Sequence, residues 1–267
     1  MKLDGNKYYR MPFIFGPMFD RDNIPKIPYP KIETLAMQYK SDPEAIATLL
    51  PECYQPAKDS LVTVIFGYYD GLEFMGGGQY RIATVQVSAL FKGEKDNVEG
   101  DYILVMFEND TFPIIGGRED LGVPKIYADI SPVKMLPEGH LRCEASLWGH
   151  LLFGIDLEPL KEQNKIVIQV ASKRINERPW LCYKYIPSLD GPPDADYPTM
   201  SKNDVKIEQL WLGKTGKIFF GSPSYEDVAV TKHVVDNLKT LQIKEIIQTV
   251  HIYGSSVLRY DLFRRLK

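Results

Sequence analysis

A lysine placed among apolar residues has the clearest chemical potential in this sequence. Lys125 closes the segment GREDLGVPK, residues 117–125, and stands between the pairs Val-Pro and Ile-Tyr. Removal of an ammonium group from water disfavours its charged form, so a buried lysine loses its proton more readily. A neutral lysine is a nucleophile that forms a Schiff base with a carbonyl compound. The segment therefore predicts covalent carbonyl chemistry; the simpler alternative is a surface lysine in a turn.

Two runs typical of β-strands flank this segment and would position the lysine. Residues 102–107 (YILVMF) precede it and residues 126–128 (IYA) follow it, while Glu108, Asn109 and Asp110 have the polar character of a turn. β-Branched and aromatic residues fit the half-buried surface of a sheet. If both strands lie in a core, we expect Lys125 to lie there too.

Most of the remaining chain is also predicted to form strands, with few helices. Further strands are expected at residues 61–66, 80–91, 165–171 and 218–220. A capping residue before Pro43 predicts a helix over residues 45–50, ended by Pro51, and two more short helices are expected within 228–241 and 255–266. Many short strands at close spacing predict a sandwich or a barrel.

Composition favours an enzyme of small molecules over a nucleic-acid or membrane protein. The formal net charge is -3, the pI is about 5.9, and no apolar run approaches the ~20 residues that span a bilayer. The first residues, MKLDGN, lack the apolar core of a secretory signal. Three scattered cysteines predict reduced thiols in the cytoplasm, and the four histidines show no metal-ligand spacing.

The sequence resembles the acetoacetate decarboxylase family. Residues 100–119 match the family's segment from G-D-Y to G-R-E without a gap, and the G-R-E-x4-P-K spacing places Lys125 on the family's Schiff-base lysine. Weaker matches follow in the family's order: YKSDPEAIATLLPE at residues 39–52, Tyr185–Pro187 with Asp190 and Gly191, Trp211, residues 243–246 and His251.

The resemblance implies a fold and an assembly. The expected fold is mainly β (α+β), a closed cone-like antiparallel β-barrel with additional strands and a few flanking short helices. We expect one domain over residues 1–267 with an extended N-terminal arm at about 1–30. The family forms multi-subunit assemblies, and the aromatic arm agrees with a homo-oligomer, because exposed apolar clusters mark interaction surfaces.

The chain also departs from the family's pattern near the reactive lysine. The second lysine of the family is replaced by Ile126, and the position of its arginine falls on Ile32, beside Lys31. The positions of two glutamates fall on Ile65 and Tyr80. The nucleophile is therefore matched, while the residues that handle the substrate carboxylate and proton are not.

Six residues are candidates for binding the substrate around Lys125. Arg118 and Glu119 would either fix the lysine loop as an ion pair or orient the substrate. Tyr80, Gln79 and Glu73 could replace the missing glutamates, since a phenol can donate a proton. Lys31 or Arg118 would have to receive a substrate carboxylate; if neither reaches the lysine, we expect weak or absent turnover of acetoacetate.

Three functions are compatible with these residues. The first is decarboxylation of a β-keto acid through an iminium on Lys125. The second is aldol or dehydration chemistry on another oxo-acid by the same intermediate, and the third is a non-catalytic ligand-binding barrel. The enzymatic alternatives need no cofactor or metal, because the iminium itself serves as the electron sink.

Overall fold

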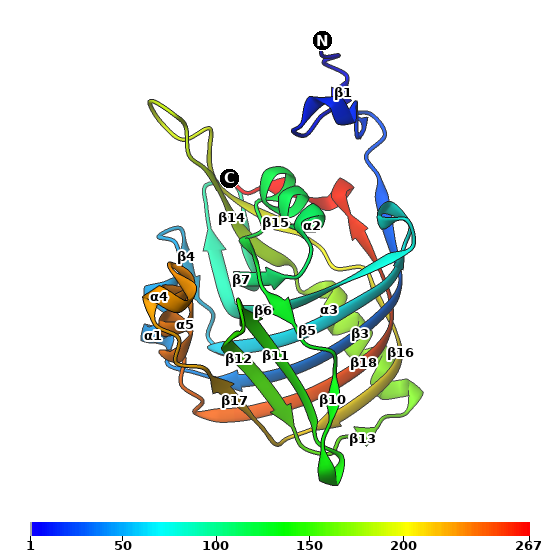
Figure 1. The fold of residues 1–267 in the computed structure, drawn as a ribbon, viewed down its shortest axis with the longest axis vertical. Helices are drawn as coiled ribbons and strands as arrows, with labels where there is room; N and C mark the ends of the chain where they lie inside the picture. The colour runs from blue at the N-terminus through cyan, green and yellow to red at the C-terminus, as the bar shows by residue number, and fades with distance from the viewer. Residues whose placement is uncertain (1) are drawn as a thin grey trace.

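The computed structural model describes residues 2–267, so Met1, the first residue of the predicted arm, lies outside the described residues. A 12-stranded sheet forms the body of the molecule, with the path β13-β16-β18-β3-β5-β6-β7-β14-β15-β19, β4 beside β6 and β8 beside β7 (Figure 1). Its strands are β3 (Lys26–Lys40), β4 (Tyr54–Pro56), β5 (Leu61–Leu72), β6 (Gly78–Lys92), β7 (Asn97–Glu108), β8 (Lys125–Tyr127), β13 (Lys161–Glu162), β14 (Trp180–Ile186), β15 (Ala195–Ser201), β16 (Val205–Gly213), β18 (Glu245–Arg259) and β19 (Arg264–Arg265).

Residues 2–267 also form two smaller sheets and five α-helices. A five-stranded sheet consists of β9 (Asp129–Ile130), β10 (Lys134–Met135), β11 (Leu141–Leu147), β12 (His150–Leu157) and β17 (Gly216–Phe220). In the N-terminal arm, β1 (Lys7–Tyr8) pairs with β2 (Phe19–Asp20). The helices are α1 (Pro43–Leu49), α2 (Thr111–Gly116), α3 (Lys165–Glu177), α4 (Tyr225–Val228) and α5 (Thr231–Lys239). None of the helices within residues 2–267 combines the length and the apolar character needed to cross a membrane.

The prediction of a mainly β chain with short helices is confirmed, but the closed antiparallel barrel is wrong. The sheets are open: the large sheet ends at β13 and β19, which pair for two residues each with their one neighbour. Strands this short cannot carry the hydrogen-bond ladder around to the opposite edge. The sheet is also mixed, because β7 pairs in parallel with both β14 and β8.

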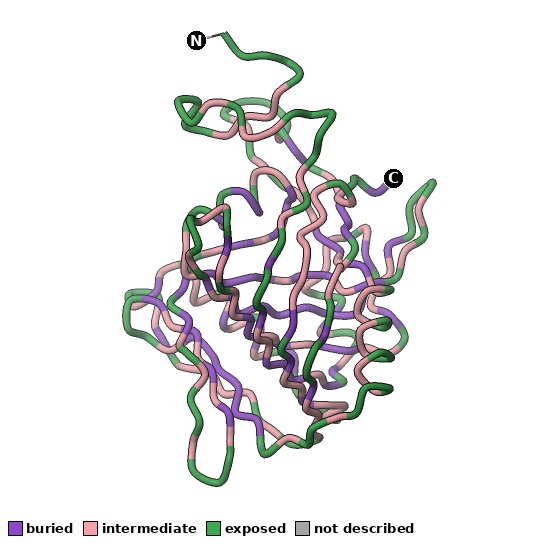
Figure 2. Tube along the Cα trace, turned by 90° about the vertical axis from the view of Figure 1, so that its right-hand side faces the viewer, coloured by how far each residue is buried: buried purple, intermediate pink, exposed green. Residues whose placement is uncertain are grey.

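The hydrophobic core lies where the five-stranded sheet packs against one face of the large sheet. Phe153 of β12 contacts Phe66 of β5 and Phe107 of β7, with ring centroids 5.7 and 5.6 Å apart. Burial of each such side chain contributes about 1.5–3 kcal/mol. Since side chains alternate along a strand, the neighbours of Phe66 on β5 point to the opposite face of the sheet. Figure 2 shows the buried residues gathered in the long strands, while residues 2–28 of the N-terminal arm are partly or fully exposed.

Two helix predictions are confirmed and two other predictions are wrong. The helices near residues 45–50 and within 228–241 are α1 and α5, and the side chain of Asp42 caps α1. Residues 165–171 were expected to form a strand but begin α3, because Asn164 caps the backbone of Ile166 and Val167 and one face packs on β16. The helix expected within 255–266 is replaced by the end of β18, one 3-10 turn and β19.

Candidate active site

Lys125 is buried at the start of β8, where it pairs with Met106 of β7. Its residue surface is 9% exposed, and its side chain lines a cavity of about 80 Å³. The Nζ atom lies 2.8 Å from Oε1 of Glu108 and donates a hydrogen bond to the carbonyl oxygen of Pro113 at 3.1 Å. The predicted burial of Lys125 is confirmed, and its catalytic role stays a prediction.

The loop before β8 wraps closely around the lysine side chain. Helix α2 continues into a π-helical turn over Gly117–Leu121, and Val123 donates a backbone hydrogen bond to the carbonyl of Gly117 at 2.9 Å. A Cβ atom on Gly117 would lie 2.4 Å from Cδ and Cε of Lys125. Gly117 therefore has no side chain because the stem of the lysine occupies that space.

Glu108 is the ionisable partner of Lys125 and is fully buried at the end of β7. Burial raises the pKa of Glu108, and the attraction of Lys125 opposes this shift. Its Oε2 atom has no hydrogen-bond partner among residues 2–267. The carboxyl group therefore holds a proton more readily than an exposed glutamate does, and one of its oxygens remains available to a ligand.

The other walls of the lysine cavity are aromatic and aliphatic. The hydroxyl groups of Tyr29 and Tyr80 lie 2.9 Å apart, and burial raises the pKa of Tyr29 to about 12, so its phenol is protonated at neutral pH. The residues that line the cavity are Tyr29, Tyr69, Tyr80, Ile82, Met106, Glu108, Leu121, Val123, Lys125, Trp180, Ser256, Leu258 and Phe263. Within the described part of the chain, Lys125 is thus the one cation in this lining.

Of the six residues predicted to bind substrate, only Tyr80 lines this cavity. The guanidinium of Arg118 donates a hydrogen bond to the backbone oxygen of Lys125 at 2.9 Å, which fixes the loop. Glu119 forms no ion pair within residues 2–267, so the predicted pair between Arg118 and Glu119 is absent there. Arg118 acts on the position of Lys125 through the backbone.

Lys31, Gln79 and Glu73 lie away from the lysine cavity. The Nζ atom of Lys31 lies 3.5 Å from Oδ2 of Asp70, and both side chains are exposed. Successive side chains of a strand point to opposite faces, which explains these positions. Ile32 lines the larger cavity, so its neighbour Lys31 points outward; Tyr80 is buried, so its neighbour Gln79 points outward as well. Glu73 is exposed at the hairpin between β5 and β6.

An ion pair that the sequence analysis missed ties the N-terminal arm to the lysine loop. Arg10 donates to Asp120 through Nε at 2.8 Å, and Asp120 also accepts hydrogen bonds from Tyr8 and Tyr260. Both charged side chains are almost fully buried. The 110 residues that separate Arg10 from Asp120 leave no local signal of this contact. The arm residues Phe13, Ile14 and Phe15 remain exposed, and the predicted homo-oligomer stays a prediction.

A second cavity of about 260 Å³ adjoins the lysine cavity inside the curved sheet. The positions where the family pattern falls on Ile32 and Ile65 both line this second cavity. The two cavities share the lining residues Tyr69, Ile82, Met106, Trp180, Ser256 and Leu258. Among residues 2–267, no group of three or more His, Cys, Asp or Glu side chains is arranged to hold a metal ion.

Comparisons with known proteins agree on one family. The sequence model "Acetoacetate decarboxylase (ADC)" matches residues 10–262. Acetoacetate decarboxylase 1 of Bradyrhizobium diazoefficiens is 26% identical over 228 residues, which cover 82% of this chain and 79% of that protein.

Two solved structures share the fold. One, from structural studies of acetoacetate decarboxylase, has a TM-score of 0.76 at 20% identity and covers 97% of this chain and 95% of that one. The other is the enduracididine biosynthesis enzyme MppR, complexed with the condensation product of pyruvate and imidazole 4-carboxaldehyde. Its TM-score is 0.69 at 17% identity, with coverage of 98% of this chain and 97% of that one. The chain therefore belongs to the acetoacetate decarboxylase family.

Proposed function

We propose that this protein is an enzyme that forms a Schiff base between Lys125 and a ketone or aldehyde. The buried amine of Lys125, 2.8 Å from the carboxyl group of Glu108, is the observation that carries the proposal. A Schiff base requires an unprotonated amine and a group that exchanges protons with the reacting atoms. Lys125 supplies the amine and Glu108 supplies the group that exchanges protons, within one small cavity.

The proton balance of the first steps assigns a role to Glu108. The amine of Lys125 attacks the carbonyl carbon, and the resulting carbinolamine loses water to give a cationic iminium. Iminium formation from a neutral amine takes up one proton, and Glu108 is the nearest titratable group that can donate it. The ionised Glu108 then faces the iminium as its counter-ion, and the cavity remains electrically balanced for an uncharged substrate.

Decarboxylation of a β-keto acid is the reaction that family membership supports. The iminium accepts the electron pair of the breaking carbon–carbon bond, carbon dioxide leaves, and the enamine takes a proton at carbon. A substrate carboxylate would add a negative charge beside Glu108, and no arginine lines the lysine cavity within the described residues. Lys31 and Arg118 do not line it either. We therefore expect weak or absent turnover of acetoacetate itself.

Aldol or dehydration chemistry is the second candidate, and Glu108 favours it. A carboxylate beside an iminium can remove an α-proton to form an enamine, which then adds to an aldehyde or expels a leaving group. The fold shared with MppR, whose structure contains a condensation product, is compatible with such a reaction.

Borohydride trapping tests the proposal. The protein is incubated with acetoacetate, pyruvate or a neutral ketone, reduced with borohydride, and its peptides are analysed by mass spectrometry. We expect a reduced adduct on Lys125 that is absent from Lys125→Arg and retained in Lys173→Arg, a control on the exposed face of α3. Carbon dioxide release distinguishes the two reactions. A wild-type protein that forms no adduct with any of these compounds would contradict the enzymatic proposal and favour a binding protein.

A further inference from the structure

We infer that the larger cavity beside Lys125 binds the apolar chain of an extended carbonyl compound, whose carbonyl group reaches the lysine. This inference rests on the proposed Schiff-base function. The cavity of about 260 Å³ shares six lining residues with the lysine cavity, so a ligand can occupy both. Acetoacetate has no chain that could fill this space.

Strand register arranges the cavity as a series of layers. On β3, Ile32, Thr34, Ala36 and Gln38 point to the same side and all line the cavity. At about 3.3 Å per residue, these positions extend over roughly 20 Å. Ile32 pairs with Tyr69, which also lines the lysine cavity, so this row of residues leads away from Lys125.

The middle of the cavity is apolar, and its far end combines amide and hydroxyl groups with the ion-paired side chains of Asp101 and Arg178. Ala36 pairs with Ile65 on one side and with Val250 on the other, which makes an aliphatic layer. One pair further along, Gln38 lies between Thr63 and Gln248, and Thr63 pairs with Gln86. Small side chains at residues 34 and 36 leave the space that a ligand chain would occupy.

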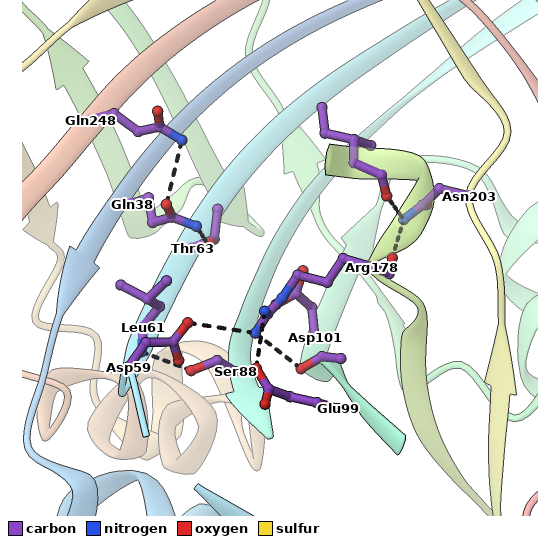
Figure 3. Close-up of polar contacts among 12 residues, drawn as sticks. Gln38, Asp59, Leu61, Thr63, Ser88, Glu99, Asp101, Arg178, Asn203 and Gln248 are labelled. Atoms are coloured by element: carbon purple, nitrogen blue, oxygen red, sulfur yellow. Dashed lines mark hydrogen bonds and ion pairs between the residues drawn. The ribbon is translucent and has the colours of Figure 1, made fainter. Parts of the chain in front are cut away.

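Hydrogen bonds hold the polar layer at the far end in place. Gln38 donates to Thr63 at 3.1 Å and accepts from Gln248 at 3.4 Å (Figure 3). Arg178 also lines this end, but its guanidinium is engaged by Asp101 at 2.6 Å and Glu99 at 3.4 Å. The far end thus offers amide and hydroxyl groups to the tip of a ligand, and the apolar layers contact its chain.

Hydrophobic burial predicts how chain length affects binding. Each buried methylene is expected to improve affinity about fourfold. We propose to trap acetone and methyl hexyl ketone on Lys125 with borohydride over a range of ketone concentrations. The expected result is that methyl hexyl ketone gives half-maximal trapping at a concentration at least about a hundredfold lower, since its chain adds several methylenes.

A variant that fills the cavity sharpens the test. Ala36→Phe places a ring in the aliphatic layer, away from the lysine cavity lining, and should remove the preference for the longer ketone while acetone is still trapped. Ala47→Phe makes the same change at an exposed position of α1 and should keep the preference. If Ala36→Phe does not fold, as judged by circular dichroism, Ala36→Leu takes its place.

The outcomes separate this inference from the proposed function. Equal trapping of both ketones by the wild type, or a preference unchanged in the cavity-filling variant, would overturn the chain site and leave the Schiff-base function intact. Absence of any adduct on Lys125 would overturn both.

Discussion

Strand β7 carries an acid paired with a cation near each of its ends: Asp101 is half-buried and Glu108 is fully buried, and the two acids differ in how many partners they have. Near the start of β7, Asp101 accepts a hydrogen bond from Arg178 at 2.6 Å, and Glu99 and Asp59 lie within 3.4 and 3.9 Å of the same guanidinium. At the other end, Glu108 meets Lys125 alone and leaves Oε2 without a partner among the described residues.

Burial acts on both acids in the same direction. It raises the pKa of Asp101 and of Glu108, and each neighbouring cation opposes the shift. Arg178 is planar, always charged and contacted by three acids, so it does not exchange a proton near neutral pH. Glu108 instead has a single cationic partner within residues 2–267, the amine of Lys125. Asp101 thus meets a fixed charge, whereas Glu108 meets an amine and keeps one carboxyl oxygen without a partner among the described residues, and the proposed chemistry would use that difference.

The largest expected effect follows from removing the nucleophile. Lys125→Ala and Lys125→Arg should each lower turnover by on the order of 10³-fold or more, because arginine keeps its charge and cannot form the iminium. Turnover of a ketone identified by trapping, with circular dichroism as the folding control, measures this effect. Near-normal turnover in either variant would exclude covalent catalysis by Lys125.

Substitution of the acid partner should have the next largest effect. Glu108→Gln keeps the shape of the side chain but cannot exchange a proton, so Schiff-base formation should slow by about 10²-fold. Asp101→Asn is the matched change at the other end of β7 and should leave the rate of acetone trapping unchanged, because Asp101 lines the larger cavity and not the lysine cavity. Stopped-flow or quenched trapping compares the two rates; equal slowing in both variants would assign Glu108 a structural role.

Asp101→Asn, which is expected to leave trapping unaffected, should instead lower the stability of the fold. Asp101→Asn removes the closest charged partner of Arg178 and should lower the free energy of unfolding by about 1–3 kcal/mol. Urea denaturation at neutral pH measures the change, with Asp70→Asn on the exposed surface as the control. A stability equal to that of the wild type would show that Glu99 and Asp59 suffice for Arg178.

The smallest predicted effect is a pH dependence of stability due to Glu108. Because its pKa is raised on folding, Glu108 contributes stability below its unfolded pKa of about 4.3, and this contribution is lost as the pH rises through the folded pKa. In Lys125→Met the opposing attraction is gone, so the loss between pH 5 and 8 should reach about 1 kcal/mol or more. The double variant Lys125→Met, Glu108→Gln should lack this slope in urea titrations at several pH values.

The sequence predicted the buried lysine but not its partner Glu108, for a physical reason. Gly117, Arg118 and Glu119 lie close to Lys125 along the chain, so their spacing can be read directly from one sequence. Glu108 stands before Asn109 and Asp110, and three polar residues in a row are typical of a turn. The parallel pairing of β7 with β8, which places Glu108 beside the lysine, is a long-range property that the local pattern does not encode.

The errors in the fold have the same origin. Residues 165–171 are β-branched enough for a strand, but Val167, Ile168, Ala171 and Ile175 recur at helical spacing and pack on β16. The expected strand ends at residue 171, so the helical spacing of these apolar residues, which extends to Ile175, is not apparent within it. A barrel closes only if the two edge strands of the sheet pair with each other. The edge strands β13 and β19 have two residues each, which is too short a pattern to predict from sequence whether they pair.

The contact of Gly117 with Lys125 determines when the lysine side chain loses its conformational freedom. A free lysine side chain samples many rotamers, and fixing it costs up to ~2 kcal/mol of entropy. Because the lysine stem lies against the bare Cα of Gly117, that freedom is given up as the chain folds and not as a substrate arrives. In the proposed reaction, a glycine with no functional group of its own would thus lower the entropy cost of bringing amine and carbonyl together, because the lysine side chain is already fixed.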